Sequence, residues 1–179
     1  TIVYVSRIDT GKGWNVLIDA ILELRLSGDF AGKRVLFVGY GEQAEMLNEK
    51  INDLDLSDCC YYLGPKTHRE LSELYNQADI MIFPTMLYES LGLVGIEAMA
   101  CGCPVIGSDI GCLPEYIKEG ITGFLFEPGN SHELAERIVD FYKLTEKQRN
   151  TMRLEAIRYV DKYESRKISQ ALINKIKEI

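Results

Sequence analysis

The sequence of 179 residues predicts a three-layer α/β fold, with one parallel sheet covered by helices on both faces. Three observations predict it. Short β-branched and aromatic runs alternate with segments of helical periodicity. The expected strands recur about every 20 to 30 residues, which leaves room for a helical crossover between parallel strands. Runs such as VLFV at 35–38 are continuously apolar, as strands buried on both faces require.

Each predicted strand is a short run rich in β-branched, aromatic or other apolar residues. The strands are expected at 2–7, 34–39, 60–63, 80–84, 105–108 and 123–126. Each predicted helix shows apolar residues three or four positions apart. The helices are expected at 15–26, 43–53, 68–77, 93–101, 114–118, 132–144, 146–159 and 165–179.

Individual helices carry further signals. In helix 43–53 we expect Met46, Leu47 and Ile51 to face the core. Helix 114–118 begins at Pro114, where the missing N–H of proline costs nothing. The C-terminal helices are more charged, and we expect them to add a covering layer to a single domain of residues 1–179.

Composition restricts the class of protein. Hydrophobic residues make up 46% of the chain, enough for a sizeable core, and no apolar run is long enough to predict a membrane span. The net charge of −7 argues against duplex nucleic acid or an anionic membrane surface as the main partner. Five cysteines without disulfide or zinc spacing suggest reduced thiols and a cytoplasmic setting. Because the chain opens directly on a strand, we expect it to be a piece of a longer protein.

Ligands of parallel sheets bind at the carboxyl ends of the strands, which directs attention to the loops there. The loop at 6–14 offers Arg7 and Lys12, with Gly11 and Gly13 for a turn. The planar fork of an arginine and the point charge of a lysine together suit a diphosphate. The alternative is a solvated turn with two surface charges.

The loop after the second strand, VGYGEQA at 38–44, is close to a dinucleotide-binding fingerprint. That fingerprint normally follows the first strand, so Gly39 and Gly41 also suit a tight turn near some other ligand.

Glu89 and Glu97 lie eight positions apart, on either side of a turn that leads into a helix. A helix N-terminus receives phosphate, and Gly92 lets the backbone approach it. The carboxylates would repel phosphate but can accept hydrogen bonds from neighbouring hydroxyls. Hydroxyls on both sides of a diphosphate are the layout of a nucleotide sugar. Each glutamate taken alone could also be structural, as a cap or as the partner of a buried cation.

On these residues the chain resembles the C-terminal, donor-binding domain of a GT-B glycosyltransferase of glycosyltransferase family 4, the glycosyl transferases group 1. The resemblance runs from about residue 2 to residue 144 and is most specific in the Glu-x7-Glu motif from Glu89 to Glu97. The further motif pieces are Arg7, Lys12-Gly13, Gly39-Tyr40-Gly41, Phe83-Pro84, Leu113-Pro114-Glu115 and Thr122-Gly123. The chain departs from the family pattern at Ser6 and Cys112, where glycine is usual.

The resemblance implies a Rossmann-like domain, one half of a GT-B fold, that takes a nucleotide-diphosphate sugar as donor substrate and needs no metal or other cofactor. It implies a retaining transferase whose acceptor is held by an absent N-terminal domain, which would also make any peripheral membrane contact. The implied catalytic residues are Arg7 and Lys12 on the diphosphate and Glu89 on the sugar hydroxyls. The implied donor-binding residues are Glu97 on the ribose, Ser90, Leu91, Gly92 and Leu93 on the phosphates and sugar, Leu63 and Pro65 near the base, and Gly39.

Other function classes remain open at this stage. The chain could bind a nucleotide sugar without catalysis of its own, or form part of a sugar-nucleotide epimerase of the same fold. A glycoside hydrolase needs two carboxylates that flank one bond, about 5 to 9.5 Å apart, whereas here a phosphate-type turn separates them. A nicotinamide oxidoreductase would depend on Gly39 and Gly41. We expect the isolated chain to transfer no sugar, because half of the cleft is missing.

Overall fold

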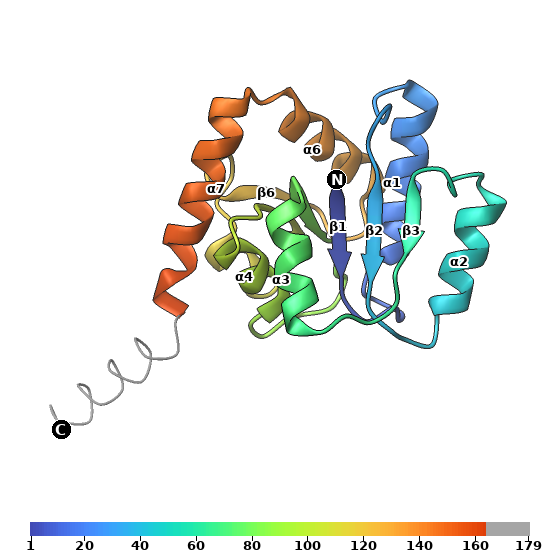
Figure 1. Cartoon of the computed structure of the whole chain (residues 1–179), viewed down its shortest axis with the longest axis horizontal. Coiled ribbons are helices and arrows are strands. Elements are labelled where there is room, and N and C mark those ends of the chain that lie inside the picture. The colour runs from blue at the N-terminus through green and yellow to red at the C-terminus, as the bar shows by residue number, and fades with distance from the viewer. Residues whose placement is uncertain (164–179) are drawn as a thin grey trace, which may run out of the picture.

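A computed structural model describes residues 1–163 as a six-stranded parallel sheet with helices on both faces (Figure 1). The helix predicted at 165–179 lies outside the described residues. The strands are β1 (Ile2–Val5), β2 (Val35–Val38), β3 (Cys60–Tyr62), β4 (Ile80–Phe83), β5 (Val105–Ser108) and β6 (Gly123–Phe126). Their order is β3-β2-β1-β4-β5-β6, so the order reverses between β1 and β4, as in doubly wound nucleotide-binding sheets. The α/β prediction is therefore confirmed.

The predicted helices within residues 1–163 are all present, with ends that differ by no more than two residues from the expected ones. They are α1 (Trp14–Ser27), α2 (Ala44–Asp53), α3 (His68–Gln77), α4 (Leu93–Ala100), α5 (Leu113–Tyr116), α6 (Ser131–Lys143) and α7 (Glu146–Val160), followed by a short 3₁₀ turn (Asp161–Tyr163). Capping boxes begin α3 at Thr67 and α7 at Thr145, where the cap hydroxyl accepts a backbone N–H.

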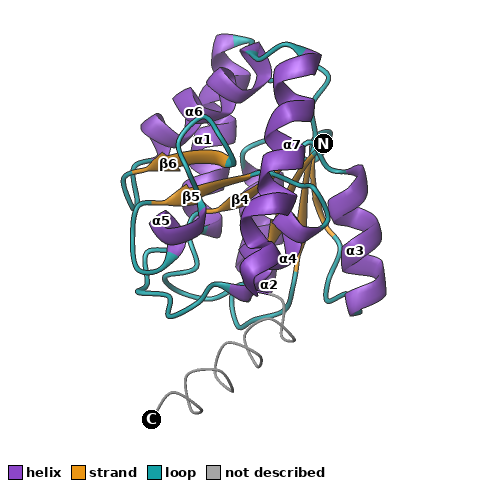
Figure 2. Cartoon of the chain, turned by 90° about the vertical axis from the view of Figure 1, so that its left-hand side faces the viewer, coloured by secondary structure: helices purple, strands orange, loops and turns teal. Residues whose placement is uncertain are grey.

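Successive residues of a strand pack on opposite faces of the sheet. In β1, Ile2 and Tyr4 join a core with α1, α2 and α6, whereas Val3 and Val5 join a core with α3, α4, α5 and α7. Figure 2 shows the strands between α1 and α6 on one side and α3, α4 and α7 on the other. Because both faces are covered, the strands are continuously apolar, and each fully buried large side chain contributes about 1.5 to 3 kcal/mol.

The expectation for Met46 is wrong. Leu47 and Ile51, four positions apart, are buried against the sheet, while Met46 is 52% exposed. A helix turns about 100° per residue, and α2 contacts the domain along one narrow stripe. Met46, next to Leu47, therefore lies beside that stripe.

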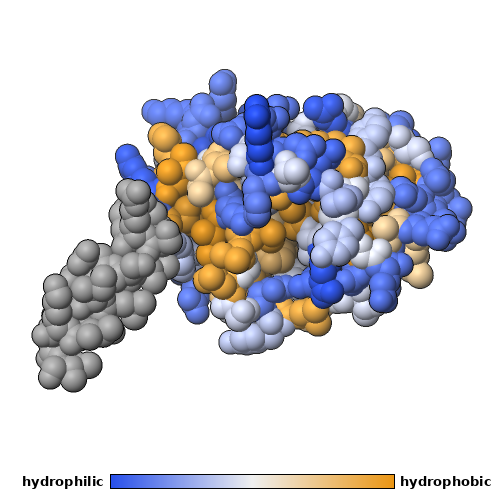
Figure 3. All heavy atoms as spheres, turned by 60° about the horizontal axis from the view of Figure 1, so that its bottom comes forward, coloured by the Kyte–Doolittle hydropathy of each residue, from blue (hydrophilic) through white to orange (hydrophobic). Residues whose placement is uncertain are grey.

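None of the helices in residues 1–163 combines the length and apolar character that crossing a bilayer requires. Apolar side chains do gather at the carboxyl edge of the sheet, which Figure 3 brings toward the viewer. The exposed ones in the chain between β4 and the first turn of α4 include Met86, Leu87, Leu91 and Leu93. They surround the part of the molecule where the charged residues discussed next are found.

Candidate functional site

A cavity of about 340 Å³ lies where β1 and β4 end, between the loops that follow these two strands. The strand order reverses between β1 and β4, and open α/β sheets bind ligands at this point because the adjacent loops diverge. The residues that line the cavity are Ser6, Arg7, Lys12, Phe83, Glu89, Ser90, Leu91, Gly92, Leu93 and Val94. The structure therefore brings seven of the eleven sequence-predicted site residues to one place.

An ion pair crosses the cavity from one loop to the other. Lys12 Nζ lies 2.7 Å from Glu89 Oε1, and both side chains are largely shielded, with 15% and 19% of their surfaces exposed. Thr85 Oγ1 lies 3.1 Å from the same carboxylate oxygen. An ammonium group has three N–H donors, so Lys12 can hold Glu89 and still donate to a ligand in the cavity.

Arg7 is held less tightly at the edge of the cavity. Its Nη1 lies 3.0 Å from Asp9 Oδ2, and 59% of the Arg7 side chain is exposed. Asp9 Oδ1 accepts the backbone N–H of Glu42 at 2.8 Å. Asp9 therefore links Arg7 to the loop after β2, while the guanidinium keeps donors that are accessible to a ligand.

Glycine allows the two loops to meet backbone to backbone. Gly13 has φ +75°, and a Cβ added there would lie 1.7 Å from the carbonyl oxygen of Pro84. The Met86 N–H donates to the carbonyl of Gly11 at 2.8 Å. No side chain fits at Gly13, so this glycine sets the distance between the Lys12 loop and the Glu89 loop.

The N-terminus of α4 opens into the cavity. Its N-cap is Gly92, with φ +62° and no side-chain cap, and the Leu93 and Val94 N–H groups have no hydrogen-bond partner in residues 1–163. The Tyr116 hydroxyl donates to the Gly92 carbonyl at 3.2 Å, and a Cβ on Gly92 would lie 2.7 Å from that hydroxyl oxygen. Unpaired N–H groups and the positive end of the helix dipole make this a place for an anion.

Glu97, the residue that the resemblance assigns to the ribose, lies outside the lining of this cavity. It lies in the second turn of α4 and is partly buried. Within the described chain its carboxylate has no hydrogen-bond or ion-pair partner. Burial, and next the charge of Glu97, raises the pKa of Tyr75, whose buried hydroxyl also lacks a partner among the described residues. Glu97 therefore lies outside this cavity, close enough to Tyr75 of α3 for its charge to act on the Tyr75 hydroxyl.

Gly39, Leu63 and Pro65 lie outside the lining as well, at the ends of β2 and β3. The Gly39 N–H donates to the Gly64 carbonyl at 3.0 Å, and the Tyr62 hydroxyl donates to the Gly39 carbonyl at 2.9 Å. A Cβ on Gly39 would lie 1.8 Å from the Ser6 carbonyl oxygen. Gly39 thus serves close packing with the β1 loop, and Leu63 and Pro65 are exposed nearby.

Sequence reasoning missed Asp9, Thr85 and Tyr116. Asp9 and Thr85 are ordinary polar residues in loops, and only the folded contacts show that they hold Arg7 and Glu89. The available signal for Thr85 was its place directly after an apolar strand that ends in Pro84. Tyr116 gave no signal, because its contact with Gly92 joins segments 24 positions apart.

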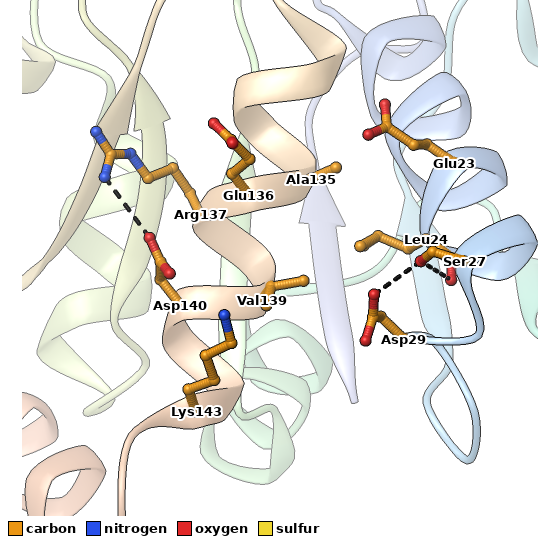
Figure 4. Close-up of a pocket in the computed structure, with 10 residues that line it drawn as sticks. All are labelled: Glu23, Leu24, Ser27, Asp29, Ala135, Glu136, Arg137, Val139, Asp140 and Lys143. Carbon is orange, nitrogen blue, oxygen red and sulfur yellow. Dashed lines mark hydrogen bonds and ion pairs between the residues drawn. The ribbon is translucent and has the colours of Figure 1, made fainter.

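A second cavity, of about 360 Å³, lies between α1 and α6 (Figure 4). It is lined by the end of α1 and the turn after it, from Glu23 to Asp29, and by α6 from Ala135 to Lys143, and it shares no residue with the cavity between β1 and β4. Its charged groups are of both signs and pair locally, as Arg137 Nη1 does with Asp140 Oδ2 at 3.8 Å. Across residues 1–163, no three His, Cys, Asp or Glu side chains are grouped as metal ligands would be.

Comparisons with known proteins agree with this geometry. The family model described as Glycosyl transferases group 1 matches residues 1–158. The amylovoran biosynthesis glycosyltransferase AmsK of Erwinia amylovora is 32% identical over 139 residues, which cover 75% of this chain and 34% of AmsK. Among solved structures, HepE of Anabaena in complex with UDP superposes with a TM-score of 0.87 at 26% identity, over 99% of this chain and 48% of HepE.

A third comparison concerns the extent of the domain. The C-terminal domain of the group 1 glycosyl transferase LpcC from Francisella tularensis superposes with a TM-score of 0.78 at 25% identity, over 92% of this chain and 86% of that domain. This chain thus spans about a third of AmsK and about half of HepE, but nearly all of an isolated domain of the third protein. With its fold, its site geometry and these matches, the chain belongs to the glycosyl transferases group 1.

Proposed function

We propose that this chain is the C-terminal, donor-binding half of a retaining glycosyltransferase of family 4, which transfers a sugar from a nucleotide-diphosphate sugar to an acceptor held by an N-terminal half. The observation that carries the proposal is the cavity between β1 and β4. It combines Lys12, Arg7 and Glu89 with the uncapped N-terminus of α4.

The donor diphosphate is proposed to lie against Arg7, Lys12 and the backbone N–H groups at the start of α4. These groups provide positive charge from two sides, and the N–H groups of Leu93 and Val94 are unpaired within the described chain. Glu89, on the far side of the ion pair, is proposed to accept hydrogen bonds from the hydroxyls of the sugar.

In the proposed reaction, the bond between the anomeric carbon and the β-phosphate oxygen breaks, and its electron pair stays on the leaving diphosphate. The acceptor hydroxyl forms the new bond to the anomeric carbon, and its proton passes to the phosphate oxygen that the broken bond releases. Negative charge therefore grows where Arg7, Lys12 and the α4 N-terminus are located. Preorganised donors aimed at such developing charge supply a large share of catalysis in many enzymes.

The nucleotide is proposed to be uridine diphosphate, because HepE was solved with UDP and with UDP-glucose. We place the ribose beside Glu97 and the base near Gly39, Leu63 and Pro65. Gly39, Leu63 and Pro65 continue from the cavity along the carboxyl ends of β2 and β3.

Isothermal titration calorimetry of residues 1–179 with UDP, GDP and ADP tests the proposal. We expect UDP to bind and the other two diphosphates to bind more weakly. If no diphosphate binds at millimolar concentration, the proposed function is wrong. For the retaining stereochemistry, the test is the anomeric configuration of the product formed by the full-length protein, read by NMR.

A further inference from the structure

Thr85 is a fully buried hydroxyl residue directly after the strand that carries the site. It follows Pro84, just beyond the end of β4, and its exposed fraction is 0%. A buried hydroxyl costs free energy unless it is hydrogen-bonded. The partners of Thr85 therefore show what this position does.

A hydroxyl has one proton to donate, and three acceptors surround Thr85 Oγ1. Glu89 Oε1 is the nearest, at 3.1 Å, whereas the carbonyl oxygens of Leu87 and Gly11 are at 3.4 and 3.5 Å. Glu89 is also the only charged acceptor of the three, and hydrogen bonds to charged groups are roughly twice as strong as neutral ones. The Leu87 N–H donates to Oγ1 at 3.2 Å, which occupies a lone pair of the hydroxyl. The proton of Thr85 is therefore directed to Glu89.

The Glu89 carboxylate is asymmetric as a result. Its Oε1 receives both Thr85 and Lys12, at 3.1 and 2.7 Å, while its Oε2 has no partner among the described residues. The main chain of Glu89 is fixed too, since its carbonyl accepts the Cys112 N–H at 3.1 Å. One carboxylate oxygen is thus held by the protein, and the other remains available to a ligand in the cavity.

We propose that Thr85 is a positioning residue for sugar recognition. Its hydroxyl, together with Lys12, fixes Glu89 so that Oε2 is presented to the hydroxyls of the donor sugar. This inference rests on the proposed function and extends it. Lys12 alone would leave the carboxylate free to rotate about the Lys12 contact, whereas two donors on Oε1 define its plane.

The experiment compares Thr85→Val, which removes the hydroxyl at nearly constant size, with Thr85→Ser, which keeps it. Calorimetry gives the affinities of the parent and of each variant for UDP, UDP-glucose and UDP-N-acetylglucosamine. We expect Thr85→Val to weaken the better-bound UDP-sugar about tenfold, the loss of one charge-assisted hydrogen bond, with UDP changed less than about twofold. Thr85→Ser is expected to restore the sugar preference. Equal weakening of UDP and UDP-sugar, or no weakening of either, would overturn the proposal.

A second measurement needs no donor and separates this inference from the proposed function. Melting temperatures are recorded for the parent, Thr85→Val, Glu89→Ala and the double variant. If Thr85 holds Glu89, Thr85→Val lowers the melting temperature less in the Glu89→Ala background than in the parent. The same decrease in both backgrounds would show that the two side chains are uncoupled and would overturn the inference. If none of the three ligands binds the parent, the proposed function is refuted. The four melting temperatures would still show whether the Thr85 and Glu89 side chains are coupled.

Discussion

Lys12 and Glu89 are 77 positions apart in the sequence, and their Nζ and Oε1 atoms lie 2.7 Å apart in the fold. Each side chain is more than four-fifths shielded from solvent. Such a pair is costly to break from one side only, because the remaining charge is left shielded without compensation. The pair also contributes no net charge to the cavity, since the ammonium group of Lys12 offsets the carboxylate of Glu89.

We expect Lys12→Met to weaken UDP binding by about 1.5 to 3 kcal/mol, the value of a hydrogen bond to a charged group. The variant should also be less stable, because Glu89 loses its counter-charge. Calorimetry and thermal unfolding measure the two effects. Lys50→Met is a matched control, since Lys50 forms a pair of the same 2.7 Å length with Asp19, away from the cavity. Parent-like UDP affinity in Lys12→Met would contradict the role of Lys12.

Glu97→Ala tests the ribose role of a residue that does not line the cavity. If Glu97 accepts a ribose hydroxyl, the variant binds UDP more weakly by about 1.5 to 3 kcal/mol and loses the preference for UDP over 2′-deoxy-UDP. Calorimetry with both nucleotides measures this, and Glu73→Ala on the exposed side of α3 serves as the control. An unchanged preference would remove Glu97 from the ribose site.

Gly13 and Gly28 flank the same helix, α1, and both have left-handed φ values, +75° and +86°. Alanine costs about 1 to 2 kcal/mol at either position from its backbone conformation alone. Only at Gly13 would the added Cβ meet a backbone atom, the Pro84 oxygen at 1.7 Å, whereas nothing lies within 4 Å at Gly28. Gly13→Ala should therefore lower the free energy of unfolding clearly more than Gly28→Ala, by chemical denaturation. Equal losses would mean that the loop relaxes freely.

His132 links α6 to α1 in a way that depends on pH. Its Nδ1 lies 2.6 Å from Glu23 Oε1, and this hydrogen bond raises the pKa of His132 above its usual 6.5. A raised pKa means that the folded state favours the charged form. The contribution to stability is therefore complete below pH 6.5 and is lost as the pH rises through the folded-state pKa.

Denaturation of the parent and of His132→Gln between pH 5.5 and 8.5 should show a small difference in stability, largest at the acid end. The matched control is His68→Gln, because His68 has no carboxylate within ion-pair distance in the described residues. A difference between parent and His132→Gln that grows with pH would contradict the assignment.

The isolated chain is expected to bind donor and to transfer no sugar at a useful rate. Catalysis requires the acceptor hydroxyl close to the anomeric carbon, and proximity alone can supply about 7 to 11 kcal/mol of a barrier. A product assay with residues 1–179, UDP-glucose and a panel of acceptors measures it. Turnover near 1 per second, about the low end of the enzyme range, would show that no second half is needed.

The sequence predicted the elements well because both faces of the sheet are buried, so apolar runs such as Val35–Val38 mark strands without ambiguity. It also placed Arg7, Lys12 and Glu89 at strand ends. The order of the strands was not predicted, since it depends on crossovers that local patterns do not encode. The same reason explains why the direct contact between Lys12 and Glu89 was not foreseen.

The errors and omissions have physical causes as well. Met46 was assigned to the core because helical spacing does not state how wide the buried stripe is. The place of Glu97 outside the cavity lining was not foreseen, because its spacing from Glu89 along the chain does not state whether both carboxylates line one cavity. Asp9 and Thr85 were missed because their roles consist of contacts to other side chains.

The pairing of β1 with β4 has a consequence for biosynthesis. Ile2 at the start of the chain is in register with Ile80, and the α4 N-terminus follows only at Leu93. A ribosome must therefore have released about half of the domain before the loop after β1 and the start of α4 can come together around the cavity. Earlier in translation, the nascent chain contains Arg7 and Lys12 but not yet Glu89 or the start of α4. The contacts that hold Glu89 and Gly92 come later still, because Cys112 and Tyr116 must also have left the exit tunnel.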